Sequence, residues 1–226
     1  MQKHEQVVVI GASGFGREAL DVLEAMRADG ARIEVSGVVD DAPSDLNLRR
    51  LEERGVRYLG TREDWLSASG PGTLFVLGIG DPGARRRVAA ELEQAGYVPF
   101  RAIHPSAVLG TNCVVDQSAV VCARAVISTN VRLGRYVHVN PNATIGHDAI
   151  LDDFVSVNPG SVISGEVHLH PGVLVGAGAV VLQQLTINDH TIVGAAALVT
   201  KSVPAGRTVK GVPGRWESDN LTERGE

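Results

Sequence analysis

The chain has 226 residues, a formal net charge of −5 at pH 7 and a pI near 5.8. This length allows one large or two small domains with a sizeable core, and the acidic balance argues against nucleic acid as the main partner, because phosphate binding usually needs a basic face. Aromatic residues make up only 4% of the chain and apolar residues 44%. We therefore expect a core built from Val, Ile, Leu and Ala.

The first residues and the two cysteines indicate the cellular compartment of the protein. The apolar stretch at residues 7–10 is too short for a signal peptide or a membrane span. Cys113 and Cys122 show no spacing typical of a metal site, and we interpret them as buried thiols in a reducing compartment. These features predict a cytoplasmic protein without a membrane span.

Strands alternate with helices in the first half of the chain. Short apolar strands are predicted at residues 7–10, 34–40 and 73–80, and helices at residues 17–30 and 84–97, each with a glycine near its end. This alternation predicts a parallel sheet of the Rossmann-like, nucleotide-binding kind.

A glycine-rich loop, GASGFG at residues 11–16, joins the first strand to the first helix. Gly11, Gly14 and Gly16 let the backbone approach a ligand closely, and a helix N-terminus favours a phosphate. The spacing is not the GxGxxG of dinucleotide enzymes, so a tight strand–helix turn is the alternative interpretation.

The ends of the second and third strands are expected to face the same crevice as the glycine-rich loop, at the carboxyl ends of the strands. Asp40 and Asp41 follow the second strand and either contact a base or ribose or form a solvated turn. Gly78 and Gly80 end the third strand.

A strict six-residue period begins near Ile103 and marks the second half of the chain. Stepping by six from Leu109 to Val199 gives sixteen positions, and every one is Leu, Ile or Val. The residue after each is often Gly, Asn, Asp or Ser, as a tight corner requires. This pattern is typical of a parallel β-helix in which three hexapeptides make one triangular coil, so that residues about eighteen apart stack in columns. The ladder predicts about five coils without an insertion.

The segment ATIGHDA, residues 143–149, differs from the rest of the ladder because it carries a histidine followed by a carboxylate. His147 lies two residues after the buried Ile145, at a corner, and Gly165 follows it in the same column one coil later. A glycine stacked against an imidazole leaves space above the ring and an unshielded backbone N–H. Asp148 could fix the tautomer of the imidazole and stabilise the imidazolium. A solvated corner histidine beside an acid is the alternative.

Other polar residues of the ladder have structural explanations. Asn140 and Asn158 stack in one column and predict an asparagine ladder that hydrogen-bonds the corner backbone. His168 and His170 flank Leu169 on another coil. A zinc enzyme of the γ-carbonic-anhydrase type would need a three-histidine site with two of the histidines five apart, and the sequence has no such pair. We therefore expect no metal site.

Several motifs occur together in a fixed order: GASGFG, VVDD, IHPSA, the IGHD corner and the C-terminal stretch TIVGAAALVTKSVPAGRTVKGVPGRW. From Val7 to Arg215 the chain resembles the hexapeptide-repeat sugar acetyltransferases, which include sialic-acid O-acetyltransferase-like proteins and PglD-type N-acetyltransferases of nucleotide-linked amino sugars. The resemblance implies a Rossmann-like domain that binds a nucleotide sugar over residues 1–102. It also implies a left-handed β-helix acetyltransferase domain with a C-terminal loop over residues 103–226.

The resemblance also implies a chemistry. Acetyl-CoA would be the co-substrate, and the acceptor would be a nucleotide-linked 4-amino-4,6-dideoxyhexose that attacks the thioester directly. His147 would act as general base and Asp148 would orient it. The backbone N–H of Gly165 would stabilise the oxyanion. The protein would be a homotrimer with active sites between subunits.

Two groups of binding residues follow from the resemblance. The residues expected to hold the nucleotide sugar are Gly11, Ser13, Gly14, Phe15, Gly16, Asp40, Asp41, Gly80 and Asn140. The residues expected to hold acetyl-CoA are Ser156, Gly165, Gly176, Ala177, Gly178, Ala195 and Arg215. Relatives often have a histidine at the position of Phe15, so the identity of the acceptor stays open. Some relatives have a histidine at the position of Ser156, and its absence would weaken a contact to the thioester without removing the base.

Three alternatives remain at this point. The enzyme could acetylate a sugar hydroxyl, as the sialic-acid type does, because spacing cannot separate N- from O-acetylation. The β-helix could be a non-catalytic trimeric scaffold for a ligand-binding domain. An NAD-dependent oxidoreductase is disfavoured, since the first domain is too short for two mononucleotide-binding halves. The sequence does not distinguish UDP, GDP and dTDP.

Overall fold

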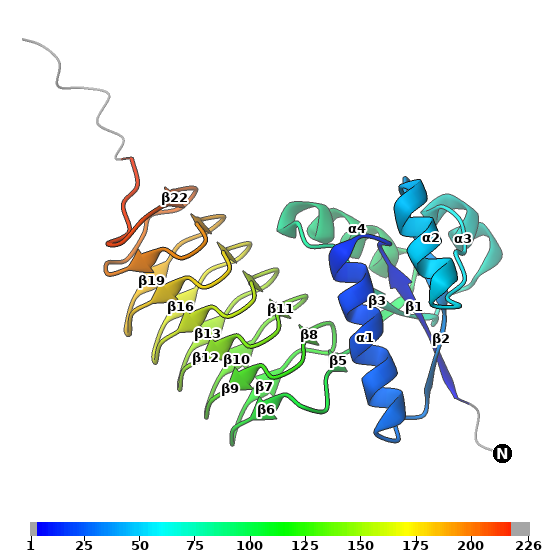
Figure 1. The fold of residues 1–226 in the computed structure, drawn as a ribbon, viewed down its shortest axis with the longest axis horizontal. Helices are drawn as coiled ribbons and strands as arrows, with labels where there is room; N and C mark the ends of the chain where they lie inside the picture. Colours follow the sequence, from blue (N-terminus) through cyan, green and yellow to red (C-terminus); the bar gives the residue numbers. More distant parts are fainter. Residues whose placement is uncertain (1–3, 218–226) are drawn as a thin grey trace, which may run out of the picture.

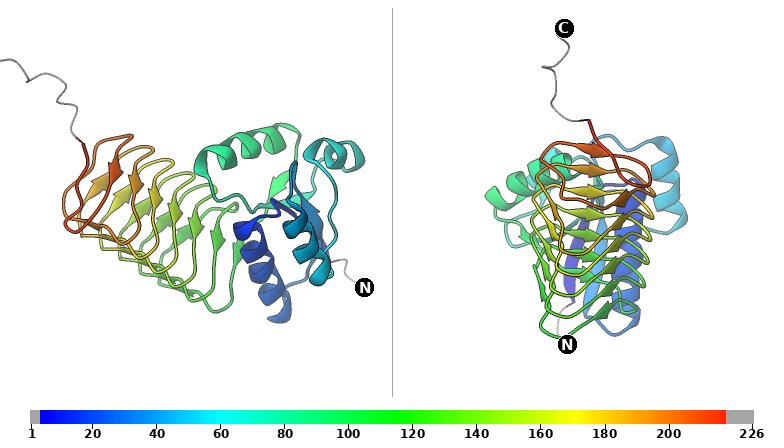
Figure 2. Two further views of the ribbon diagram at one scale, coloured as in Figure 1. Left: turned by 45° about the horizontal axis from the view of Figure 1, so that its top comes forward. Right: turned by 90° about the vertical axis from the view of Figure 1, so that its left-hand side faces the viewer.

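The structure is a computed structural model that describes residues 4–217. Figure 1 shows an α/β part, which spans residues 5–99, and a long triangular β-helix that begins at β5 (Ala102–Ile103). The α/β part sits against the first coils of the β-helix, and the last coil lies at the opposite end of the molecule (Figure 2). Within residues 4–217, no helix is long and apolar enough to cross a membrane.

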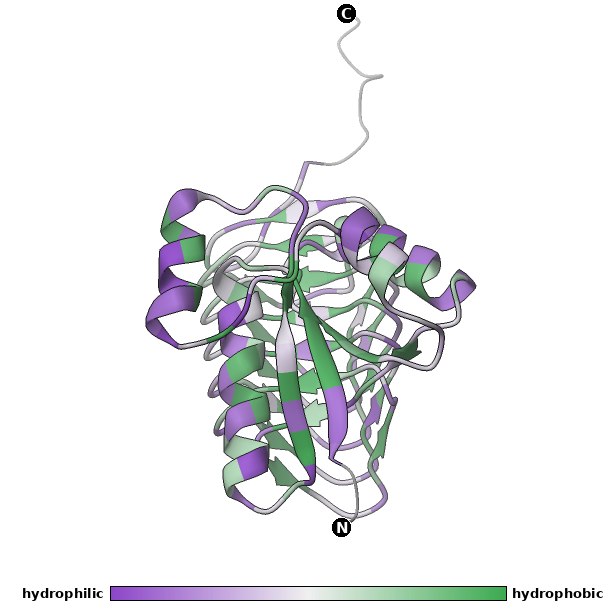
Figure 3. Ribbon diagram, turned by 90° about the vertical axis from the view of Figure 1, so that its right-hand side faces the viewer, coloured by the Kyte–Doolittle hydropathy of each residue, from purple (hydrophilic) through white to green (hydrophobic). Residues whose placement is uncertain are grey.

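The α/β part is built around a four-stranded parallel sheet with the strand order β2-β1-β3-β4. Its elements are β1 (Glu5–Ile10), α1 (Gly14–Ala28), β2 (Ile33–Val39), α2 (Asp45–Glu53), α3 (Arg62–Ala68), β3 (Leu74–Leu77), α4 (Pro82–Gln94) and β4 (Val98–Pro99). In β1, Val7 and Val9 pack against α1, whereas Val8 and Ile10 pack on the other face, with α4. A strand covered on both faces needs a continuous apolar run, and Figure 3 shows this run along the centre of the sheet.

The predicted strands and helices of this part are all present, with shifted ends. The first helix, α1, begins at Gly14, so the second half of the glycine-rich loop forms its first turn. The sequence pattern predicts no element where α2, α3 and β4 lie. These are short, and α3 begins with a reciprocal pair of hydrogen bonds between Thr61 and Asp64 rather than with a strong apolar period.

The β-helix consists of two-residue strands on three faces, which the chain visits in turn. The strands of the first face are β5, β8 (Val120–Val121), β11 (His138–Val139), β14 (Ser156–Val157), β17 (Leu174–Val175), β20 (Ile192–Val193) and β22 (Thr208–Val209). Those of the second face are β6 (Val108–Leu109), β9 (Val126–Ile127), β12 (Thr144–Ile145), β15 (Val162–Ile163), β18 (Val180–Val181) and β21 (Leu198–Val199). Those of the third face are β7 (Val114–Val115), β10 (Arg132–Leu133), β13 (Ile150–Leu151), β16 (His168–Leu169) and β19 (Thr186–Ile187).

The apolar ladder lines the interior as predicted. From Val121 to Val199 every ladder residue is at most 2% exposed, whereas Leu109 is 38% exposed because the first coil is covered on one side only. The seven strands of the first face mark six coils rather than about five, and the last step, from Val193 to Val209, is shortened to sixteen residues. The predicted fold class, an α/β Rossmann-like domain followed by a parallel β-helix, is confirmed.

Arg85 on α4 fastens the α/β part to the first face of the β-helix. Its Nη2 donates to the carbonyl oxygen of Phe154 and to Ser156 Oγ, each at 2.9 Å, and its Nη1 lies 3.1 Å from His138 Nδ1. The side chain is 0% exposed. Burial lowers the pKa of the Arg85 guanidinium to about 9, so it remains charged at pH 7. A buried charge is tolerated only when hydrogen bonds satisfy it. Here the acceptors come from both parts, because Nη1 also donates to the carbonyl oxygens of Ile79 and Gly80 at 2.9 and 3.1 Å.

His138 completes this junction. A guanidinium can only donate, so His138 Nδ1 accepts and the ring is neutral. Burial first, and then the charge of Arg85, hold the pKa of His138 well below 6.5. The ring of Phe15 stacks on the imidazole with centroids 4.1 Å apart and planes 20° from parallel. The glycine-rich loop is therefore held directly against the β-helix.

Replacing Arg85 by Ala is expected to destabilise the protein by about 3–5 kcal/mol, because it leaves buried acceptors on the β-helix without a donor. Urea unfolding followed by circular dichroism measures this loss. Arg87→Ala, an exposed neighbour on the same helix, is the matched control and should change the free energy of unfolding by less than about 0.5 kcal/mol. Equal effects of the two substitutions would contradict the role assigned to Arg85.

Candidate active site

His147 lies at the corner between the second and third faces, after β12. Its Nδ1 is 2.7 Å from Asp148 Oδ2, and 56% of the imidazole is exposed. A carboxylate at Nδ1 favours the tautomer with the proton on that nitrogen, which leaves the lone pair on Nε2. The pair therefore presents a basic nitrogen at the surface of the β-helix.

Asp148 is held from its other side by a residue that the sequence analysis did not single out. Asn130, one coil earlier in the same column, donates its Nδ2 to Asp148 Oδ1 at 2.8 Å. The hydrogen bond from Asn130, and next that with His147, lower the pKa of Asp148 below its ordinary 3.8. Asp148 has φ 59° and Asn130 φ 58°, the left-handed conformation that Asp and Asn tolerate best among non-glycine residues. Asn130 could have been identified from the sequence, because it precedes Asp148 by eighteen residues and so lies in the same column.

Gly165 lies against the His147 ring, as the column predicts. A Cβ at Gly165 would be 2.5 Å from both Cε1 and Nε2 of the imidazole, so any other residue would displace the ring. None of the residues 4–217 accepts a hydrogen bond from the Gly165 backbone N–H. Gly165 itself is buried, and its unpaired N–H lies beside the basic nitrogen, where an oxyanion would need a donor.

The glycine-rich loop divides into packing and open positions. A Cβ at Gly16 would be 1.9 Å from the carbonyl oxygen of Gly11, and one at Gly78 would be 2.5 Å from the Cα of Gly16, so these three glycines are required by backbone packing. In contrast, Gly14 has open space around it. Ser13, the N-cap of α1, is exposed and its side chain makes no capping hydrogen bond. The start of α1 therefore keeps free donors for an anion.

The two aspartates after β2 are engaged within the α/β part. Asp40 accepts hydrogen bonds from the backbone N–H groups of Ala12 and Ala42, at 2.7 and 2.9 Å. Asp41 pairs with Arg62 at 2.7 Å. Asp40 thus holds the glycine-rich loop, and Asp41 faces α3.

Three of the expected binding residues turn inward. The ring of Phe15 stacks on His138, Ser156 is 2% exposed and bonded to Arg85, and Asn140 is 5% exposed. Asn140 Nδ2 donates to the carbonyl oxygen of Val157 at 3.1 Å. The structure therefore uses these side chains to join the domains or the coils. Gly80, by contrast, is exposed.

The residues expected at acetyl-CoA lie mostly at the corner between the first and second faces. Ala177, Gly178 and Ala195 are exposed there. Gly176 is buried, and a Cβ on it would be 2.5 Å from the backbone nitrogen of Ala195, so it permits the close stacking of two coils. Arg215 is exposed in the terminal loop, where it lines a hollow with Lys210 and Trp216.

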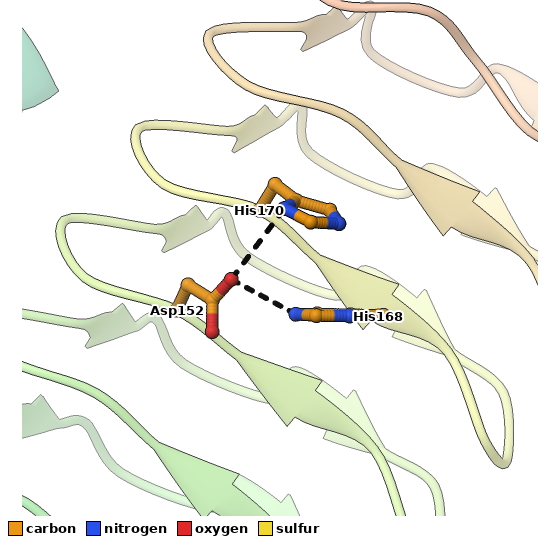
Figure 4. Close-up of side chains that lie close together, drawn as sticks. All are labelled: Asp152, His168 and His170. Atoms are coloured by element: carbon orange, nitrogen blue, oxygen red, sulfur yellow. Dashed lines mark hydrogen bonds and ion pairs between the residues drawn. The ribbon is translucent and has the colours of Figure 1, made fainter.

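One cluster of possible metal ligands was not expected. Asp152, His168 and His170 each offer one ligand atom, and these atoms lie within 4.8 Å of one another (Figure 4). The cluster is near the corner between the third and first faces, away from the corner that carries His147.

Comparison with known proteins adds independent information. Residues 6–92 match the family described as PglD N-terminal domain. A variant of perosamine N-acetyltransferase from Caulobacter crescentus, solved with CoA and GDP-perosamine, is 26% identical with a TM-score of 0.83, and the similarity covers 95% of this chain and 97% of that chain. The acetyltransferase domain of PglB from Neisseria gonorrhoeae, solved with acetyl coenzyme A, is 26% identical with a TM-score of 0.82, over 95% of this chain and 100% of that one. WeeI from Acinetobacter baumannii is 25% identical with a TM-score of 0.82, over 94% and 100%.

A search of curated proteins found no match. The similarities that were found confirm the predicted resemblance to the sugar acetyltransferases with a left-handed β-helix. They also confirm the predicted enzyme class, an acyltransferase. The predicted co-substrate, acetyl-CoA, agrees with the ligands of two of these structures.

Asn130→Ala removes the hydrogen bond that contributes most to the low pKa of Asp148, so we expect this pKa to rise toward 3.8. A ¹³C NMR titration of the carboxyl carbon measures it. Because the pKa is lowered in the folded state, the contribution of Asp148 to stability is present above the unfolded pKa and is lost as the pH falls below about 4.

Asn112→Ala is the control for this titration. Asn112 lies one coil before Asn130 and donates a hydrogen bond to it, but it does not contact Asp148. Replacing Asn112 should therefore leave the pKa of Asp148 unchanged. An unchanged pKa in Asn130→Ala would show that the carboxylate is held differently.

Proposed function

We propose that the protein transfers the acetyl group of acetyl-CoA to the amino group of a nucleotide-linked 4-amino-4,6-dideoxyhexose, with His147 as general base. The observation that carries this proposal is the exposed His147–Asp148 pair, 2.7 Å apart. Its ring lies on Gly165, whose backbone N–H has no acceptor within residues 4–217. Support comes from the similar perosamine N-acetyltransferase, which was solved with CoA and a nucleotide-linked sugar.

The transfer is a single displacement. The amine nitrogen of the acceptor attacks the thioester carbonyl carbon, and His147 Nε2 removes the amine proton as the C–N bond forms. The Gly165 N–H donates to the oxyanion. The C–S bond then breaks, the CoA thiolate takes the proton back from the imidazolium, and the base is free again. Asp148 stays ionised, because its pKa is held low, and stabilises the imidazolium meanwhile.

The nucleotide would bind to the α/β part. The uncapped start of α1 at Ser13 and Gly14 offers backbone N–H groups to the phosphates. Gly80, at the end of the neighbouring β3 segment, is exposed and leaves room for a ligand. Since Phe15 and Arg85 hold this part against the β-helix, a sugar attached to the nucleotide stays at a fixed distance from the corners of the β-helix.

The second face of the β-helix supports the proposed homotrimer. Its outward side chains form one column, which is apolar except for Thr144: Val108, Val126, Thr144, Val162, Val180 and Leu198. Val108, Val126 and Val162 are 58%, 41% and 37% exposed. Thr144, Val180 and Leu198 are half-buried. A stripe of exposed and half-buried aliphatic residues along one face is typical of a surface that another copy covers.

A three-fold arrangement with the second face toward the axis would complete the active site. The corner with His147 borders the second face on one side, and the corner with Ala177, Gly178 and Ala195 borders it on the other. Around a three-fold axis, the first corner of one copy therefore meets the second corner of the next. Three coils separate His147 from Ala195, about 14 Å at 4.8 Å a coil, and the exposed Arg215 lies beyond them. The pantetheine of CoA would follow this seam and its phosphates would reach Arg215.

Release of free thiol from acetyl-CoA tests the activity. With a panel of GDP-, UDP- and dTDP-linked 4-amino sugars, we expect release with one amino sugar and a loss of about 10²–10⁴-fold in kcat for His147→Ala. His190→Ala, which removes another exposed histidine of the β-helix, should keep full activity. Release only with a hydroxyl acceptor such as sialic acid would move the protein to O-acetylation. Equal activity of His147→Ala and the parent protein would contradict the proposed base.

Val162→Asp tests the assembly. An aspartate in the middle of the second face places charges around the three-fold axis, so we expect light scattering to change from three times the chain mass of 23.8 kDa to a single chain. Ile192→Asp, at an aliphatic position on the first face that is 45% exposed against 37% for Val162, should leave the trimer intact. A trimer that survives Val162→Asp would place the interface on another face.

A further inference from the structure

Two histidines and an aspartate from adjacent coils converge at the edge of the third face. His168 Nε2 is 2.8 Å from Asp152 Oδ2, and His170 Nδ1 is 3.7 Å from the same oxygen. Strand pairing explains the convergence: β13 pairs with β16 residue for residue, so Asp152, which follows β13, stacks with His170, which follows β16. Figure 4 shows both rings directed at the carboxylate.

A simple ion pair accounts for only part of this arrangement. The His170 ring makes no hydrogen bond with any residue in 4–217, although its Nδ1 lies between Asp152 and Asp189, 3.7 and 3.5 Å away. The two imidazoles are stacked with centroids 4.1 Å apart and planes 22° from parallel. One cation held between these rings and carboxylates would give a partner to all four side chains, His168, His170, Asp152 and Asp189.

The spacing matches first-row metal coordination. With metal–ligand bonds of about 2.0–2.1 Å, neighbouring ligand atoms lie about 2.9 Å apart in an octahedral site and about 3.3 Å apart in a tetrahedral one. The 2.8 and 3.7 Å separations bracket these values, and the third lies within 4.8 Å, which small side-chain rotations would close. Two imidazole nitrogens and a carboxylate oxygen favour Zn²⁺, Co²⁺, Ni²⁺ or Cu²⁺ over Mg²⁺ and Ca²⁺.

We propose that Asp152, His168 and His170 form a binding site for one divalent transition-metal ion, with Asp189, whose Oδ1 lies 3.5 Å from the same His170 nitrogen, as a further ligand. The three side chains are about a third exposed, so water can fill the remaining coordination positions. The ion would tie two consecutive coils together from outside, in addition to the backbone ladder. The site lies on a different corner from His147, so metal binding is separate from the proposed transferase chemistry.

Isothermal titration of the full chain with Zn²⁺, after removal of metal with a chelator, tests the site. We expect one Zn²⁺ per chain, and at least about tenfold weaker binding in His168→Ala, His170→Ala and Asp152→Asn. His190→Ala is the matched control and should bind like the parent protein. Because the ion would bind only the folded state, Zn²⁺ should raise Tm in the parent and in the control but not in the three variants.

Co²⁺ provides a second readout, since its visible absorption reports nitrogen and oxygen ligands directly. The band should appear with the parent protein and be lost in His170→Ala. Should an alanine variant lose its circular dichroism signal, His170→Gln, which keeps a polar side chain of similar size, replaces it. The proposal is overturned if no Zn²⁺ binds stoichiometrically, if the three variants bind it like the parent, or if Mg²⁺ binds as tightly as Zn²⁺.

Discussion

Each coil of the β-helix lies about 4.8 Å above the previous coil, which is the spacing of paired strands. At this distance the strand pairing determines which side chains of neighbouring coils are in contact. A side chain at a corner is covered by the residue eighteen positions later, because the strands pair in parallel without an insertion between Leu109 and Val199. The imidazole of His147 can lie flat only because that residue is Gly165. Asp148 is held by the residue eighteen positions earlier, because Asn130 on the preceding coil donates a hydrogen bond to its carboxylate.

The contact between the two domains fixes the position of the proposed nucleotide-binding region relative to the His147 corner. A nucleotide on the α/β part can present its sugar to a corner of the β-helix only when the two parts do not move independently. Arg85 and Phe15 supply this restraint through Ser156 and His138 on the first face. Two of these side chains, Phe15 and Ser156, stand where relatives can carry histidine, so the chain uses for domain contact positions that the resemblance assigned to ligands. In the proposed function, acceptor choice would therefore depend on other groups around α1 and β3.

Periodicity explains what the sequence could predict. A repeat that places Leu, Ile or Val at every sixth residue determines the coil, the faces and the column of His147, and the adjacent acid is visible directly. Arg85 could not be found in this way, because it is the first of three consecutive arginines on an amphipathic helix, and the pattern gives no reason to bury one of them. His168 and His170 flank a ladder residue and suggest opposite directions, yet the turn after β16 brings both rings to one carboxylate. Contacts made at a corner depend on side-chain rotation, which a six-residue period does not encode.

The proposed acetyl transfer takes place at the His147 corner, in the seam between two copies. A crystal structure of the protein with CoA is the first test. We expect the CoA sulfur beside His147 Nε2 and the Gly165 N–H of one copy, with the pantetheine running along Ala177 and Gly178 of its neighbour. CoA bound within a single copy, or with its sulfur at another corner of the β-helix, would show that the transfer does not take place in this seam.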